Sequence, residues 1–346
     1  MRVRLGNYVK IKTGKLDANA SSTDGKYPFF TCSKEPLKIS TYSYDCECVL
    51  VAGNGDLNVK YYNGKFDAYQ RTYIIEDNGS GTLYIPYLYF FMERYVEELR
   101  KQSIGGVIKY IKLGNLTDAI IELPDINTQK IIVKMLRKAK STLDMRKDEL
   151  GAFDDLIKSR FVEMFGNPII NTKGWPKKRF DEICENLDSR RKPLTASERE
   201  AGRYPYYGAS GVVDYVANYI FDEDLLLVSE DGANLLMRST PIAFSVSGKV
   251  WVNNHAHVVR FKEMSMQKYI EIYFSMIDIS DQITGSAQPK LNQAKLNAIR
   301  FAIPNEALLD EYYDFIKKVD KSKVAVQKSL DETQLLFDSL MQKYFG

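Results

Sequence analysis

Two segments of equal length, far apart in the sequence, most constrain what this chain can fold into. Residues 124–166 and 304–346 each contain 43 residues, begin at a proline and end in Phe-Gly. Steps of four and three residues from positions 132 and 312 reach ten positions in each segment, eight of them apolar. More than four heptads of this spacing predict a coiled-coil seam. The residues predicted to form the seam are Leu136, Leu143, Leu150, Phe153, Ile157, Ile316, Val319, Leu330, Phe337 and Leu340.

The sequences that precede the two helical segments share the same pattern of motifs. GKYPFFTCS at 25–33 is echoed by GRYPYYGAS at 202–210. In both copies an apolar, strand-like run then enters a glycine loop, CVLVAGNGD at 48–56 and LLLVSEDGAN at 225–234. Alternating strand-like residues, a helical stretch and a further glycine loop follow in each copy, which predicts a duplicated domain. The further loops are SIGGVIKYIKL (103–113) and ITGSAQPKLNQ (283–293).

These patterns predict an α+β chain with two homologous mixed α/β globular units and two long helices. The expected order is a globular unit at 1–123, a helix at 124–166, a second unit at 167–303 and a second helix at 304–346. If a pseudo-twofold axis relates the copies, the helices form an antiparallel coiled coil, and about 39 helical residues make a rod of roughly 58 Å. Parallel pairing is the alternative, and it would require each globular unit to span the rod differently.

The composition is typical of a soluble globular protein. The chain is 45% hydrophobic and 27% charged, and its net charge of +3 neither requires nor excludes a nucleic-acid partner. Four cysteines without a C-x-x-C pair, and no recognisable signal peptide, fit a reducing compartment. No run approaches 18 apolar residues, so no membrane span is expected. We therefore expect a cytoplasmic protein.

The motifs of common catalytic sites are missing from the sequence. His255 and His257 could share one face of a strand and bind a metal, but no companion ligands are evident. VAGNGD at 51–56 looks like a cofactor-binding glycine loop, although a tight turn explains it more simply. No Gly-Lys precedes Ser or Thr as in a phosphate-binding loop, and no set of spaced carboxylates suggests a nuclease. The chain is expected to bind rather than catalyse, with no metal or cofactor of its own.

Two similar heads on a rod suggest a long partner with a repeating surface. B-DNA repeats its grooves about every 34–36 Å, so a rod of this length could place two heads on one duplex. The glycine loops of both heads are polar, and Asn or Gln can pair with adenine while Arg or Lys pairs with guanine. A solvated surface is the simpler interpretation of any single basic cluster. The repetition of the loops favours duplex DNA.

The layout of the chain resembles the specificity subunit of type I restriction-modification enzymes. The resemblance covers essentially the whole chain, and it depends on the order and spacing of several short motifs rather than on any one of them. The motifs are GRYPYYGASG (202–211), TGSAQPKLN (284–292), ELP and AIP at the helix starts (122–124, 302–304), and SRFVEMFGNP and DSLMQKYFG at the helix ends (159–168, 338–346).

The resemblance implies a separate role for the globular domains, the helices and the partner subunits. In this family two target recognition domains each read one half of a bipartite DNA sequence in the major groove. The paired helices set the spacer and dock two adenine-methyltransferase subunits, and motor-nuclease subunits complete the enzyme. S-adenosylmethionine, ATP and Mg would belong to those partners, and the specificity subunit itself is not catalytic. The loop at 103–113 departs from the pattern because it lacks the Gln-Pro of the second copy.

Matching the loops to the family gives the candidate DNA contacts. A non-catalytic coiled-coil scaffold, with two heads that bind protein or glycan, is the alternative from another functional class. A single-chain restriction-methylation enzyme is disfavoured because no Asp/Asn-Pro-Pro-Tyr motif is present. The predicted contacts are Asn54, Asn58, Lys60, Gln70 and Arg71 in the first head, and Arg190, Arg191, Asn234, Arg238, His257 and Gln288 in the second.

Overall fold

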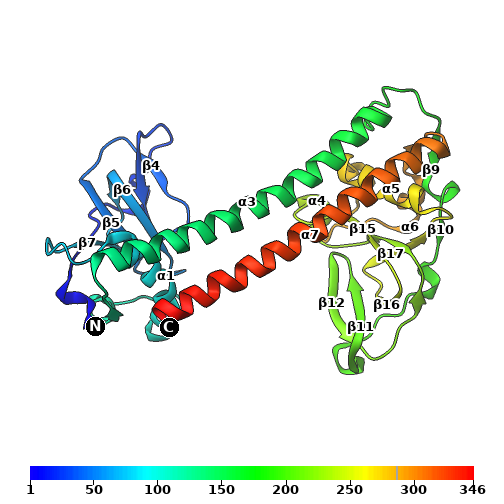
Figure 1. Cartoon of the computed structure of the whole chain (residues 1–346). Coiled ribbons are helices and arrows are strands. Elements are labelled where there is room, and N and C mark those ends of the chain that lie inside the picture. The colour runs from blue at the N-terminus through cyan, green and yellow to red at the C-terminus, as the bar shows by residue number, and fades with distance from the viewer. Residues whose placement is uncertain (286) are drawn as a thin grey trace. The chain divides into compact units, whose positions relative to one another are not determined.

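The computed structural model describes residues 1–285 and 287–346, which form two compact units (Figure 1). Unit 1 consists of Met1–Asp148 together with Gln327–Gly346, and unit 2 is the intervening Glu149–Val326. Each unit therefore takes one part of each long helix, α3 (Ile126–Phe165) and α7 (Glu306–Phe345), in addition to its own sheets. Among the described residues, no helix is both long enough and apolar enough to cross a lipid bilayer.

Unit 1 is built on a six-stranded sheet with the order β2-β7-β5-β6-β3-β4. The central strand β5 ends in the fully buried run Cys48–Ala52, whose β-branched and apolar residues explain its position inside the sheet. Helix α1 contributes Tyr87, Leu88 and Phe90 to the core beside it. The elements are β1 (Arg2–Arg4), β2 (Val9–Thr13), β3 (Tyr27–Phe30), β4 (Leu37–Ile39), β5 (Tyr44–Ala52), β6 (Val59–Ala68), β7 (Thr72–Asp77), α1 (Ile85–Gln102), α2 (Leu113–Thr117) and β8 (Ile120–Glu122), with β1 paired to β8.

Unit 2 divides the equivalent strands between two four-stranded sheets, β10-β17-β14-β15 and β12-β11-β16-β13. The long strand β6 of unit 1 has no single counterpart, because β15 and β16 share its role. The elements are β9 (Lys177–Arg179), β10 (Glu185–Asn186), β11 (Ala201–Gly208), β12 (Gly211–Val216), β13 (Phe221–Asp222), β14 (Leu225–Ser229), α4 (Asn234–Met237), β15 (Ala243–Val246), β16 (Lys249–Val252), β17 (Ala256–Arg260), α5 (Met264–Met276), α6 (Gln293–Ala298) and β18 (Arg300–Ala302), with β9 paired to β18.

The repeated Tyr-Pro phrase occupies the same place in both units. In unit 1 it forms β3, which pairs in parallel with β6 so that Phe29 lies opposite Asp67. In unit 2 it forms the end of β11, which pairs in parallel with β16 so that Tyr206 lies opposite Trp251. Phe29 and Tyr206 are both buried. The echo in the sequence therefore marks a shared strand and a shared core position.

The two long helices begin at equivalent capped positions. Asp125 follows Pro124, and its side chain accepts hydrogen bonds from the backbone N–H groups of Asn127 and Thr128, both at 3.0 Å. A bond from the Thr128 hydroxyl is the largest cause that holds the pKa of Asp125 below its usual value, and the two backbone bonds act in the same direction. Asn305 caps α7 in the same way through the Leu308 N–H at 2.9 Å. Side chains that satisfy the free N–H groups of a first turn explain why both helices start here.

The long helices run antiparallel in unit 2. Asp154 of α3 pairs with Lys323 of α7 at 2.5 Å, and farther along α3 Arg160 pairs with Glu311 at 3.0 Å. Residue numbers therefore fall along α7 as they rise along α3. In unit 1 the opposite ends meet, since the first part of α3 and the last part of α7 share one core.

Seam positions predicted from the heptad pattern are all buried or half-buried in the structure. In unit 2, Phe161 stacks on Tyr269 of α5 with ring centroids 5.0 Å apart and meets Tyr312 of α7 edge-on at 5.8 Å. The end of α3 is thus part of the unit 2 core and not only a connector. The predicted fold class, two mixed α/β units with two long antiparallel helices, is confirmed.

Candidate nucleic-acid interface

Three loops of unit 1 are joined by backbone hydrogen bonds at the ends of the sheet strands. The loop after β5 donates from the Gly53 N–H to the Arg71 carbonyl at 2.8 Å, in the turn between β6 and β7. It also accepts from the Ile111 N–H at 2.9 Å, and its Gly55 N–H donates to the Lys109 carbonyl at 2.9 Å. We call residues 53–58, 69–71 and 103–112 the three-loop surface of unit 1.

Unit 2 repeats the same three bonds. The Glu230 N–H donates to the His255 carbonyl at 2.9 Å, the Gly232 N–H to the Pro289 carbonyl at 3.0 Å, and the Leu291 N–H to the Glu230 carbonyl at 2.7 Å. Residues 230–234, 253–255, 283–285 and 287–292 are the three-loop surface of unit 2. In this register His255 takes the place of Arg71.

The last loop of each surface is closed by a reciprocal pair of backbone hydrogen bonds and turned by a glycine. Gly105 has φ +117°, and a Cβ there would lie 2.5 Å from the Ile108 carbonyl oxygen. Gly285 has φ +82°, and its Cβ would lie 2.5 Å from the Gln288 carbonyl oxygen. Only glycine tolerates both the positive φ and the close approach. The loops therefore hold the exposed Ile108 and Gln288 at equivalent tips.

A side chain beneath each surface donates to the same carbonyl of this last loop. The Tyr73 hydroxyl bonds to the Ile111 carbonyl oxygen at 3.2 Å in unit 1. In unit 2 His257 Nε2 lies 2.7 Å from the Leu291 carbonyl oxygen. His257 is only 1% exposed, so it lies inside the domain, below the loops.

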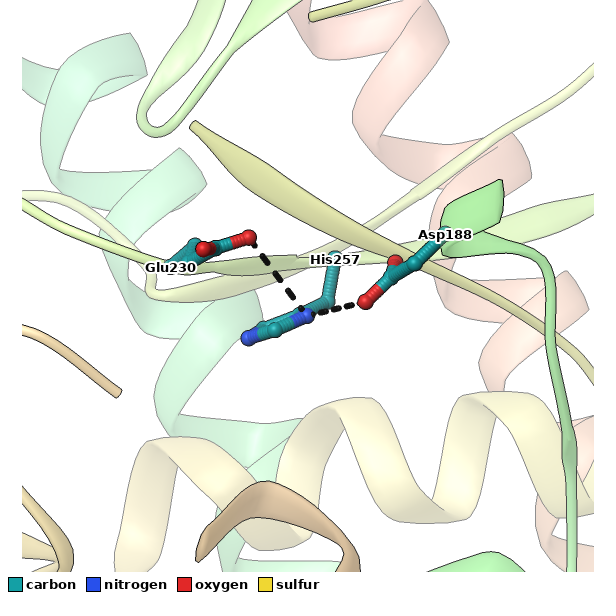
Figure 2. Close-up of side chains that lie close together, drawn as sticks. All are labelled: Asp188, Glu230 and His257. Atoms are coloured by element: carbon teal, nitrogen blue, oxygen red, sulfur yellow. Dashed lines mark hydrogen bonds and ion pairs between the residues drawn. The ribbon is translucent and has the colours of Figure 1, made fainter. Parts of the chain in front are cut away.

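Figure 2 shows the charged groups around His257. His257 Nδ1 lies 2.6 Å from Asp188 Oδ2 and 3.7 Å from Glu230 Oε2. Burial alone would raise the pKa of Asp188, but the hydrogen bond and charge of His257 hold it below its usual value. Burial acts in the same direction on Glu230, whose pKa is nonetheless held low by its bond to Arg191 and by the charge of His257.

Asp188, Glu230 and His257 could in principle bind a metal, since their ligand atoms lie within 4.8 Å of one another. Arg191 already pairs with Glu230 at 2.5 Å, and Lys290 approaches the same carboxylate at 3.2 Å. Arg191 also lies 3.3 Å from Asp188, so protein cations balance both carboxylates. His255 lies on an exposed turn outside this group, so the two histidines do not form the metal pair that a shared strand face would allow.

The structure separates the predicted contacts of unit 1 into two groups. Asn54, Gln70 and Arg71 lie on the three-loop surface, and the guanidinium of Arg71 makes no hydrogen bond or ion pair with any residue that the structure describes. Gln70 bonds to Asp17 at the surface. Asn58, although within the loop, donates to two backbone carbonyls, and Lys60 is half-buried against it, with a pKa lowered by burial.

Most predicted contacts of unit 2 use their polar groups in bonds to other residues of the same unit. Arg190 pairs with Glu223 at 2.8 Å, and Asn234 accepts a bond from the Thr240 N–H at 3.0 Å. Arg238 donates to two carbonyls near the end of α5.

Two of the unit 2 predictions need correction. The Arg191 side chain is 14% exposed and holds Glu230, and His257 is buried with both ring nitrogens engaged, so neither can reach a base from these positions. The strand and the buried carboxylates explain why both turn inward. Gln288 remains an exposed candidate on the three-loop surface.

Sequence reasoning missed Asn254 and His255, which form the exposed turn of the unit 2 surface. They border a groove of about 510 Å³ that is also lined by Arg199 and Asn253. Aligning the second copy on the first would have found them, because Gln70 and Arg71 fall on Asn254 and His255 once the strand pairs are in register.

Comparison with known proteins identifies the family. The model of the type I restriction modification DNA specificity domain matches residues 1–151 and 172–333. The specificity subunit of the type I restriction enzyme EcoDI from Escherichia coli is 38% identical over 156 residues, which is 45% of this chain and 34% of that protein. A putative specificity subunit from Haemophilus influenzae is 36% identical over 127 residues, 37% of this chain and 32% of that protein. The aligned regions thus span about a third of each relative.

Solved structures share the fold of the whole chain. The type I restriction-modification S subunit from M. genitalium superposes with a TM-score of 0.66 at 16% identity, over 100% of this chain and 96% of that one. A chain from a structure on complex assembly and conformational transition of the type I R-M system gives 0.57 at 13% identity, over 100% and 97%. At these identities the match shows the fold alone. With the family model covering most of its length, the chain belongs to the type I restriction-modification DNA specificity family.

Proposed function

We propose that this chain is a sequence-specificity subunit in which each unit reads one half of a bipartite target in duplex DNA. The observation that carries the proposal is the three-loop surface, built twice on the same backbone hydrogen bonds with different side chains at the tips. Arg71 in unit 1 is replaced by His255 in unit 2, and Ile108 by Gln288. A constant scaffold with variable tips suits two heads that recognise different base sequences.

The side chains on these surfaces fit base edges in the major groove. An exposed guanidinium such as that of Arg71 can pair with guanine, and an exposed amide such as that of Gln288 can pair with adenine. Ile108 offers an apolar surface of the kind that meets a thymine methyl group. Hydrogen-bonded backbone holds each loop, which reduces the entropy lost when the surface binds a rigid duplex.

The long helices are proposed to set the spacing of the half-sites and to dock two adenine-methyltransferase subunits. Both helices carry exposed apolar side chains, which docked subunits would cover. S-adenosylmethionine would then belong to the methyltransferases, and ATP and Mg to motor-nuclease subunits. The exposed apolar residues are Ile131, Met135, Met145, Leu156, Val162, Val324, Leu335 and Leu336.

The test is to express the chain with its methyltransferase partner in a host that lacks adenine methylation and to map modified adenines across the genome. A bipartite motif with a fixed spacer is the expected result. Replacing Gln70 and Arg71 together by Ala should relax one half of that motif and leave the other unchanged. A chain that yields no modified motif and does not bind duplex DNA would contradict the proposal and support a scaffold with protein- or glycan-binding heads.

A further inference from the structure

We propose that His257 in unit 2 and Tyr73 in unit 1 are positioning residues that determine specificity without contacting DNA. Each holds the last loop of its three-loop surface in the register that presents the tip residue to a base. The inference rests on the proposed function, because it assigns a task to residues beneath the surface that would read DNA.

In each unit, two hydrogen bonds, which we call the clamp, hold the N–H and the carbonyl of one residue of the last loop. In unit 2 the Leu291 N–H donates to the Glu230 carbonyl at 2.7 Å, and the Leu291 carbonyl accepts from His257 at 2.7 Å. Leu291 is itself fully buried. Leu291, three residues after the exposed tip Gln288, is thus fixed by hydrogen bonds to both of its backbone groups and by burial of its side chain, so the tip has little freedom to shift along a groove.

The imidazole of His257 is held in a single orientation. Its two nitrogens face two acceptors, the Leu291 carbonyl and the Asp188 carboxylate, so both nitrogens must carry hydrogens for both bonds to form. Asp188 is fixed in turn by the Val258 N–H at 2.8 Å. Lys290, which belongs to the last loop, completes the network by pairing with Glu230. The loop is therefore tied to the charged group by a side chain as well as by its backbone.

In unit 1 the same carbonyl accepts from an uncharged donor, the Tyr73 hydroxyl. The Ile111 N–H donates to the Gly53 carbonyl at 2.9 Å, and the Ile111 carbonyl accepts from the Tyr73 hydroxyl at 3.2 Å. Histidine and tyrosine share little except a ring with a polar donor at its far end. A core position needed only for packing could be filled by an apolar ring, so the property common to both copies is the donated hydrogen bond.

The test compares variants of the full chain in complex with methyltransferase subunits. Fluorescence anisotropy would measure binding to the cognate duplex and to duplexes with one base pair changed in either half-site. His257→Leu removes the donor and should lower discrimination about tenfold in the half-site read by unit 2 only, the effect of one lost buried hydrogen bond. His257→Gln retains an N–H donor and should recover part of that loss. Tyr73→Phe deletes a single hydroxyl and should affect the other half-site.

A matched control separates positioning from stability. Val259→Ala changes a fully buried side chain on the same strand as His257, and should lower the unfolding temperature without altering base discrimination. Unchanged discrimination in both His257→Leu and Tyr73→Phe, or equal losses in both half-sites, would overturn the inference. A wild-type complex with no base preference would instead contradict the proposed function itself, so the two failures are distinguishable.

Discussion

Replacing Arg71 by Ala is the most direct test of how a three-loop surface reads DNA. The Arg71 carbonyl is held by the Gly53 N–H at 2.8 Å, whereas its guanidinium makes no hydrogen bond or ion pair within the described part of the chain. The turn therefore does not depend on the side chain, and the free energy of unfolding should change by no more than about 0.5 kcal/mol. Any effect on binding can then be assigned to the missing guanidinium.

The expected size depends on what the guanidinium contacts. A bidentate contact with guanine contributes about 1–3 kcal/mol of discrimination against the wrong base, or roughly 5- to 150-fold. A contact with one phosphate would weaken all duplexes alike and reduce the slope of log affinity against log salt by about 0.9. Because the turn lies on the three-loop surface beside the exposed tip of the last loop, we expect the first outcome, confined to one base pair of one half-site.

The assay is anisotropy with a set of duplexes that carry each single base-pair change in the target, at two or more salt concentrations. Arg4→Ala is the matched control, because Arg4 is also exposed on unit 1 but pairs with Asp118 at 2.8 Å outside the three-loop surface. The variant Arg71→Ala should lose preference at one position, and Arg4→Ala at none. Equal loss for every duplex, or no loss for any, would refute the reasoning.

Three further predictions concern the core of unit 2. Phe161→Ala should lower its free energy of unfolding by about 3–5 kcal/mol in urea titrations, because the ring is fully buried, whereas Val162→Ala, which is 42% exposed, should have little effect. Asp188 has a lowered pKa, so its carboxylate stabilises the folded state at pH values above the ordinary pKa of 3.8, and this stabilisation is lost as the pH falls through the folded-state pKa. Asp188→Asn should therefore be less stable than wild type at pH 7. The difference in stability should shrink below about pH 4, as measured by acid denaturation. Burial raises the pKa of Cys184 to about 12, so its thiol should react with iodoacetamide at pH 8 only after unfolding.

Heptad spacing predicted the two long helices because a seam leaves a periodic trace in the sequence. The sequence pattern marked each segment by its proline, and the structure adds that Asp125 and Asn305, which follow those prolines, supply the side-chain caps. Long helices depend on local and repeating features. For the same reason the duplicated units could be predicted from their recurring phrases, although the split of one long strand into β15 and β16 could not.

The candidate site was harder to predict because exposure is not a local property. Arg71 and Arg191 both look like basic residues in polar loops, yet one faces solvent and the other pairs with Glu230 inside the domain. Asp188 and His257 meet across 69 positions of sequence, and no short-range pattern shows that a strand brings them together. The glycine loops were found because positive φ requires glycine, whereas no residue type or spacing in the sequence marks the polar residues beneath them.

The sharing of α3 and α7 between the units has a consequence for the order in which the protein can fold during synthesis. A ribosome that has released residues 1–148 has not yet made 327–346, which supply Met341 to the same core as Leu136. The first unit to be translated is therefore the last to be completed, contrary to the usual N-to-C progression of domains. Until α7 has been translated, the apolar face of α3 in unit 1 lacks its packing partner, and a frameshift within the codons for α7 would damage the unit that is translated first.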